Sequence, residues 1–264
     1  TENSGRTSAG CDDETGRVAP AGAVCGGLRK KGTIEMERKY LWEKEFRKIK
    51  VMYKEKNIRN PDDPVGEIFE IDTHIAEATY LFNLKGYTTG NSCEGHPHQY
   101  IPREDDCCKA TRKKYEKTVL FGDGGMYFWN DCREMVFQKL NEKRKYFTMD
   151  THSDMPIVRG FINWIPIDSV AMDGKKYSQM SIESVTTVLR LIYEDIWHII
   201  LEVAQELPDK GSYYKSVELL PEGDDTKVGD IYRDGDGFKI VNFWDDWDEE
   251  GTDETADDEN SEEV

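Results

Sequence analysis

The chain has 264 residues, of which 37% are apolar, enough to build the hydrophobic core of one large or two small domains. No run approaches about 18 consecutive apolar residues, so no membrane-spanning helix is expected. The formal net charge of −18 is uneven, because residues 243–264 hold twelve acidic and no basic side chains. The remaining 41 acidic and 35 basic residues leave residues 1–242 at −6, which argues against tight binding to nucleic acid.

Both ends of the chain are predicted to be disordered. Residues 1–35 are rich in Gly, Ser, Ala and Thr and have no apolar periodicity. Within them, "LRKKGTIEM" is what a purine-rich bacterial ribosome-binding site encodes when translated in frame, so the native protein is expected to begin at Met36. The acidic tail, residues 243–264, cannot bury enough apolar surface to fold alone, and we expect it to be available to a protein partner.

The first structured element is expected to be a helix over residues 36–56. Its apolar side chains recur with a helical period, and aromatic residues broaden the apolar face. The segment "NPDDP", residues 60–64, would follow the end of this helix, and "VGEIFEI", residues 65–71, predicts a short strand.

A second helix is predicted for residues 73–85, and both of its ends carry sequence signals. Asp72 is a favourable N-cap residue, and Gly86 can adopt the left-handed conformation that ends a helix. Apolar residues at helical spacing are expected to pack this helix on a sheet. A strand over residues 87–92 follows and leads into a polar turn.

The second half of the chain predicts further strands and helices. The strands are expected at residues 118–121, 125–129, 161–167 and 185–192, and the helices at residues 131–144 and 193–207. Together these elements indicate one α+β domain over residues 36–208, with a single mixed or antiparallel sheet and two or three packed helices. Residues 209–242 are expected to form an extension whose elements the pattern leaves open.

The turn "SCEGHPH", residues 92–98, concentrates residue types that bind metals. Cys93 and His96 are spaced so that a thiolate and an imidazole can reach one ion, and Gly95 can supply the positive φ that such a turn needs. A zinc site is expected to combine these two residues with Cys107 or Cys108. A fourth ligand is expected to be one of three residues: His98, Cys132 or His152.

Two other interpretations of this turn remain open. In one, Cys93 is a small buried hydrophobe at a strand end, and His96 bonds the backbone. In the other, the turn is a ligand-binding or catalytic pocket, with Cys93 as a thiolate or His96 as an acid–base group.

His74, in the first turn of the second predicted helix, is expected to be solvated. The six cysteines indicate reduced thiols or metal ligands in a cytoplasmic protein.

Residues 70–96, "EIDTHIAEATYLFNLKGYTTGNSCEGH", resemble a family of uncharacterised bacterial proteins from phages and mobile elements, whose motif is "LN.KGY.T..SC.GH". Residues 186–208 resemble a later block of that family, which ends in Leu-Pro. The chain departs from the family at Glu94, where the family often has Ser. The resemblance implies an accessory protein of a phage or mobile element, with a metal or small-ligand site at Cys93 and His96.

The same block is distantly similar to the tRNA wybutosine-synthesising methyltransferase family through Asp72, Asn83, "YTTGNSC" and Gly95. His96 stands where that family has Arg. This similarity implies a methyltransferase-like enzyme that uses S-adenosylmethionine and acts on a nucleotide or RNA. A third hypothesis is an acidic interaction protein whose tail imitates phosphate charge and inhibits a host nucleic-acid enzyme. The sequence leaves open which of these holds, and whether the protein is an enzyme.

Overall fold

The computed structural model describes residues 36–102, 109, 113, 119, 124–129, 132–149, 161–164 and 181–242. They belong to two compact units. The first unit draws on three segments of the chain: Thr1–Lys44, Gly95–Asp123 and Ile165–Tyr193. The second draws on Glu45–Glu94, Gly124–Trp164 and Glu194–Val264. Both predicted disordered ends, residues 1–35 and 243–264, lie outside the described residues.

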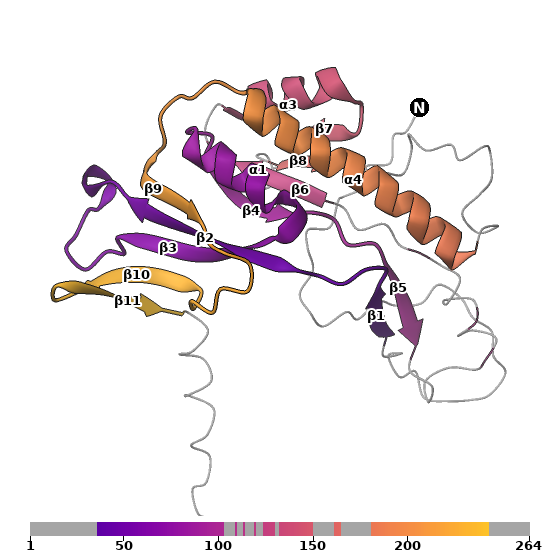
Figure 1. Cartoon of the computed structure of the whole chain (residues 1–264), viewed down its shortest axis with the longest axis horizontal. Coiled ribbons are helices and arrows are strands. Elements are labelled where there is room, and N and C mark those ends of the chain that lie inside the picture. Colours follow the sequence, from indigo (N-terminus) through magenta and orange to yellow (C-terminus); the bar gives the residue numbers. More distant parts are fainter. Residues whose placement is uncertain are drawn as a thin grey trace, which may run out of the picture. The chain divides into compact units, whose positions relative to one another are not determined.

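The second unit contains a five-stranded antiparallel sheet with the strand order β11-β10-β3-β2-β9 (Figure 1). Its strands are β2 (Phe46–Tyr53), β3 (Gly66–Asp72), β9 (Tyr214–Leu219), β10 (Gly229–Asp234) and β11 (Gly237–Val241). The strand predicted over residues 65–71 is confirmed as β3. The segment 209–242, whose elements the sequence left open, supplies three of the five strands.

The prediction of a helix over residues 36–56 is wrong. These residues form β1 (Met36–Tyr40), β2 and a short 3-10 helix, Glu55–Asn57. In β2 the alternating residues Ile49 and Val51 have no exposed surface, which is the period of a strand. β3 pairs with one edge of β2, and β9 pairs with the other. This pairing outweighs the helical propensity of a segment rich in Lys and Glu.

Helix α1 (Thr73–Leu84) confirms the second predicted helix and contacts β2, β3 and β9 (Figure 1). Its buried face includes Ile75, Ala78 and Phe82. The ring of Phe82 also meets Phe128 edge-on, with the ring centroids 5.1 Å apart. The chain leaves the helix at Gly86, whose φ of 89° is the left-handed conformation expected there.

A second antiparallel sheet in this unit has the strand order β4-β6-β8-β7. Its strands are β4 (Thr89–Cys93), β6 (Gly124–Phe128), β7 (Phe147–Met149) and β8 (Phe161–Trp164). The predicted helix at 131–144 is confirmed as α3 (Cys132–Lys143). The fold is α+β as expected, but the described residues form three sheets, so the expectation of a single sheet is wrong.

The prediction of a strand at residues 185–192 is wrong, because these residues belong to helix α4 (Ile182–Glu206). The run "VTTV" favours a strand by propensity. However, the buried residues Val185, Leu189, Ile192 and Ile196 recur at helical spacing and continue into the helix expected from residue 193. No helix among the described residues is long and apolar enough to cross a membrane.

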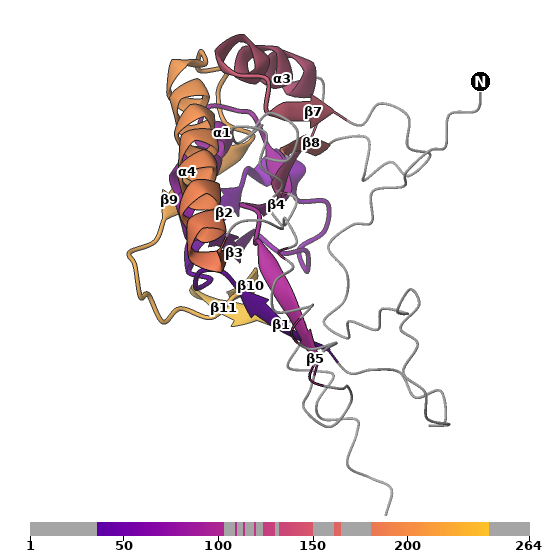
Figure 2. The same cartoon turned by 90° about the vertical axis from the view of Figure 1, so that its right-hand side faces the viewer.

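The first unit contains a two-stranded antiparallel sheet of β1 and β5 (His98–Pro102), which lie side by side in Figures 1 and 2. Its register pairs Met36 with Pro102 and Tyr40 with His98. The backbone N–H of Leu41 extends the pairing by donating to the Pro97 carbonyl at 2.9 Å. The turn that follows Glu94 therefore leads directly into a paired strand.

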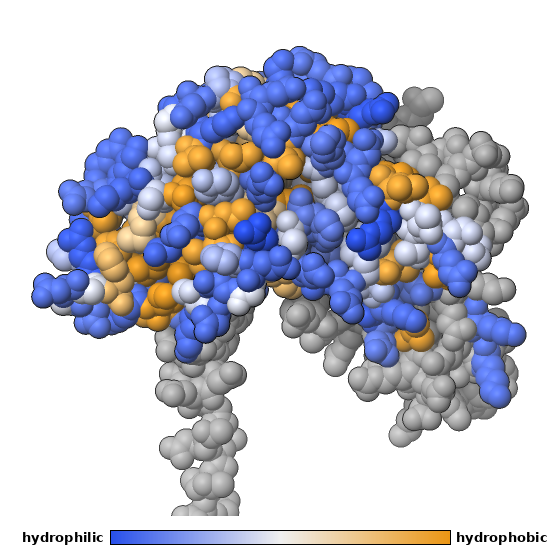
Figure 3. Space-filling model, in the orientation of Figure 1, coloured by the Kyte–Doolittle hydropathy of each residue, from blue (hydrophilic) through white to orange (hydrophobic). Residues whose placement is uncertain are grey.

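A small second core lies on the face of the five-stranded sheet opposite Ile49 and Val51. It consists of buried Val65, Ile68, Leu220 and Ile231, with Met52, Ile58 and Ile240 packed against it. Hydrophobic surface is visible over β2, β3 and β10 in the space-filling view (Figure 3). The five-stranded sheet is thus apolar on both faces, which explains why β3 lacks a simple alternation of apolar and polar residues.

The end of α4 is held by the side chain just after α1. Lys85 Nζ donates to the backbone carbonyls of Ala204, Gln205 and Leu207 at 2.9, 2.6 and 2.9 Å. These carbonyls lie at or just beyond the last turn, where a cation interacts favourably with the helix dipole.

We predict that Lys85→Met, which keeps the length of the side chain, lowers the free energy of unfolding by about 1–3 kcal/mol, because the carbonyls lose a charged donor. Urea denaturation measures the change. The control is Lys139→Met, which removes an exposed ion pair with Glu142 and should cost less than about 0.5 kcal/mol. Equal losses in the two variants would contradict the anchoring role of Lys85.

Candidate metal site at the Cys93–His96 turn

Strand β4 ends at Cys93, and the chain then buries an acidic residue. Glu94 is buried, whereas Cys93 and His96 are partly exposed. Gly95 has a φ of 93°, so the positive φ predicted for it is confirmed. A side chain is strained in this conformation, which makes glycine the favoured residue between Glu94 and His96.

The backbone of Glu94 is bonded on both sides. Its N–H donates to Asp72 Oδ2 at 2.8 Å. Its carbonyl oxygen accepts from two indoles, Trp164 Nε1 at 3.1 Å and Trp197 Nε1 at 3.0 Å. The indole of Trp164 occupies the space that a side chain at Gly124 would need, so glycine is required there. These bonds connect the end of β4 with β3, β8 and α4.

The Glu94 carboxylate binds the start of α1. Its Oε2 accepts from the backbone N–H of His74 at 3.2 Å and lies 2.9 Å from His74 Nδ1. Asp72 stands at the N-cap position, as predicted, but makes no side-chain capping bond. The carboxylate that binds the first turn therefore comes from 20 residues further along the chain. A negative charge at this end of a helix is favourable.

The sequence predicted a solvated His74, but the residue is only partly exposed and packs against an aromatic ring. Its ring stacks on the indole of Trp197, with ring centroids 3.9 Å apart and planes 20° apart. Its side chain is 30% exposed, while that of its partner Glu94 is 1% exposed. His74, Glu94 and Trp197 thus form one packed polar group beneath the turn.

Two possible ligand atoms of the second unit lie close together where their strands end. The carboxylate of Asp72 and the thiol of Cys93 each offer an atom within 4.8 Å of the other. His96 follows Cys93 by three residues and offers an imidazole. Tetrahedral zinc, with bonds of about 2.0–2.3 Å, places neighbouring ligand atoms about 3.3–3.8 Å apart. Shifts on the order of 1 Å would bring the Asp72 and Cys93 atoms to that spacing, so these donors fit a metal ion.

Two of the alternative ligands have other contacts. Cys132 lies at the start of α3, where its Sγ accepts from Lys210 Nζ at 3.6 Å. His98 Nδ1 donates to the His96 carbonyl at 2.9 Å, and burial lowers the pKa of the His98 imidazole below its ordinary value. Neither belongs to the ligand group found among the described residues. The remaining candidates lie outside those residues: Cys107, Cys108 and His152.

The sequence predicted Cys93 and His96 as metal ligands but indicated Asp72 only as a helix cap. It also missed the roles of His74 and Glu94. The available signal was position: an acidic residue at the end of one strand and a cysteine at the end of another can meet where the strands end. Nothing in the sequence distinguishes a buried glutamate in a turn from a solvated one.

Comparisons with family models, with curated proteins and with solved structures find no match to this chain.

We predict that Glu94→Ala lowers the free energy of unfolding by about 2–4 kcal/mol, because it creates a cavity and leaves the first turn of α1 without its acceptor. Thermal and urea denaturation measure this loss. Glu77→Ala, on the exposed face of α1, is the control and should change stability by less than about 0.5 kcal/mol. A loss below about 1 kcal/mol for Glu94→Ala would show that its bonds contribute little.

Proposed function

We propose that the protein binds one zinc ion through Asp72, Cys93 and His96. The observation that carries this proposal is that the Asp72 carboxylate and the Cys93 thiol offer atoms within 4.8 Å of each other, with the His96 imidazole three residues after Cys93. A mixed oxygen, sulfur and nitrogen donor set suits zinc, whereas calcium and magnesium prefer oxygen donors alone.

The surroundings of the ligands support the same conclusion. Metal-binding side chains usually have their orientation fixed by a second layer of hydrogen bonds. Asp72 has such a bond from the N–H of Glu94 to its Oδ2. Cys93 is the last residue of β4, and its pairing with Gly125 of β6 fixes its backbone. Two ligands are thus held by strand ends before any ion binds.

The fourth ligand decides what the ion does. A water molecule there would give the zinc a Lewis-acid site, as in hydrolytic zinc enzymes, whereas Cys107 or Cys108 would complete a closed structural site. A Cys93 thiolate requires a reducing compartment, so we place the protein in the cytoplasm. A role as an accessory protein of a phage or mobile element is part of the same proposal. The methyltransferase-like enzyme and the inhibitor with an acidic tail stay predictions.

Purified full-length protein is expected to contain about one zinc per chain by atomic emission spectroscopy. Cys93→Ser, His96→Ala and Asp72→Asn should each reduce this content severalfold. The asparagine keeps an oxygen that can accept from the Glu94 N–H while removing the charged ligand. Affinity should fall as the pH is lowered, because protons compete for both thiolate and imidazole.

Cys132→Ser is the matched control, because it removes another described cysteine that contacts Lys210 rather than the cluster. It should retain zinc in full. A chain without zinc after loading, or equal losses from the Cys93 and Cys132 variants, would refute the site. Loss of zinc in Cys107→Ser or Cys108→Ser would identify that cysteine as the fourth ligand and favour the structural role.

A further inference from the structure

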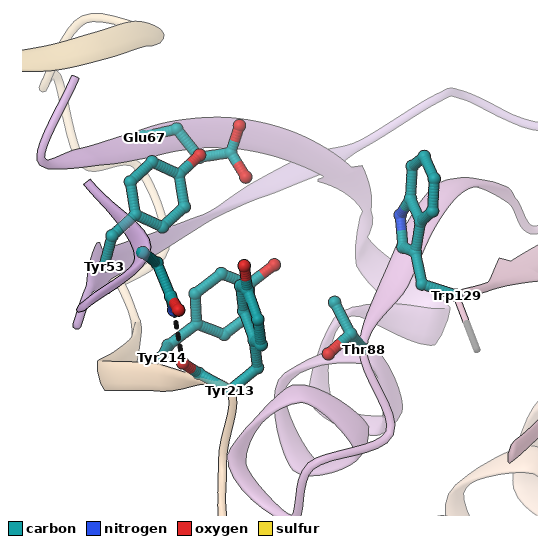
Figure 4. Close-up of a pocket in the computed structure, with 7 residues that line it drawn as sticks. Tyr53, Glu67, Thr88, Trp129, Tyr213 and Tyr214 are labelled. Carbon is teal, nitrogen blue, oxygen red and sulfur yellow. Dashed lines mark hydrogen bonds between the residues drawn. The ribbon is translucent and has the colours of Figure 1, made fainter. Parts of the chain in front are cut away.

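A separate cavity of about 500 Å³ lies wholly within the second unit (Figure 4). Its volume is in the range of small-molecule sites, roughly 300–1,000 Å³. The lining combines four aromatic side chains with one carboxylate and two neutral polar groups: Tyr53, Tyr213, Tyr214, Trp129, Glu67, Asn57 and Thr88. None of these residues belongs to the candidate metal site.

Aromatic rings form the walls of this cavity. Tyr53 and Tyr214 are stacked with centroids 6.0 Å apart, and Tyr213 meets Tyr214 edge-on at 5.6 Å. Trp129 faces them from the far side in Figure 4. Tyr214 is buried, but Tyr213 and Trp129 are about half exposed, at 49% and 51%. The cavity therefore has an aromatic base and two exposed aromatic residues at its mouth.

The single carboxylate of the lining points into this space (Figure 4). Glu67 forms no ion pair with a lysine or arginine in the described part of the chain. Burial raises the pKa of its carboxyl above the ordinary value, and the nearby charge of Asp230 raises it further. Asp230 is also its cross-strand partner in β10. A partly buried negative charge beside a like charge is costly unless a cation compensates it.

We propose that this cavity binds a small organic cation that carries a methylated ammonium group. Aromatic faces attract such cations, and the attraction is strongest where water is excluded. The Glu67 carboxylate supplies the compensating charge, so the two features select for a group that is both cationic and apolar at its surface. A bare metal ion would need several oxygen ligands, and the lining provides only one carboxylate.

A comparison of choline with its neutral isostere 3,3-dimethylbutan-1-ol distinguishes the effect of the ligand's charge on binding from the effect of its shape. Titration of the full-length chain, followed by NMR and calorimetry, should show choline binding at least tenfold more tightly than the alcohol. Glu67→Gln should weaken choline binding at least tenfold. Glu70→Gln, an exposed position on the same strand, should change it less than twofold.

The wild-type protein gives an independent test that needs no folded variant. Protons compete with choline for Glu67, whose neighbours are Tyr53, Tyr214 and Asp230, so affinity should fall as the pH is lowered through the raised pKa of the Glu67 carboxyl. Equal affinities for choline and the alcohol would overturn the proposal, as would choline binding that is independent of pH and unchanged in Glu67→Gln. Absence of choline binding up to high millimolar concentration would also overturn it.

Discussion

The hydrogen bonds of buried Glu94 link four elements of the second unit next to the candidate site. Its N–H, carbonyl and carboxylate bind β3, β8, α4 and α1 through Asp72, Trp164, Trp197 and His74. Burying a carboxylate is costly unless hydrogen bonds compensate it, so these bonds stabilise the fold of this region. Because Cys93 precedes Glu94 directly, the same bonds set where its thiol lies.

Buried Glu94 and partly buried Glu67, both in the second unit, have opposite surroundings. Glu94 Oε2 accepts from the backbone N–H of His74 and lies 2.9 Å from the His74 ring nitrogen Nδ1. Glu67 is hydrogen-bonded to the hydroxyl of Tyr53 but faces the like charge of Asp230 and aromatic rings. The first arrangement ties the carboxylate to the start of α1. We propose that a cation entering the cavity stabilises the second.

Local signals in the sequence were enough to predict α1, α3 and the left-handed glycines Gly86 and Gly95. They failed where tertiary pairing decides. Residues 46–53 have Lys-rich helical character but become a central strand, and "VTTV" in α4 has strand propensity but follows a buried helical stripe. The cluster of Asp72 with Cys93 depends on where two strand ends meet, which no local pattern contains.

We propose that the turn after β4 binds zinc through one thiolate, one imidazole and one carboxylate. X-ray absorption spectroscopy at the zinc edge of the loaded full-length chain tests this proposal most directly. We expect sulfur bound to zinc at about 2.3 Å together with nitrogen or oxygen at about 2.0–2.2 Å. The sulfur contribution from Cys93 should disappear in Cys93→Ser. A spectrum without bound sulfur, or one that Cys93→Ser leaves unchanged, would contradict zinc binding at this turn.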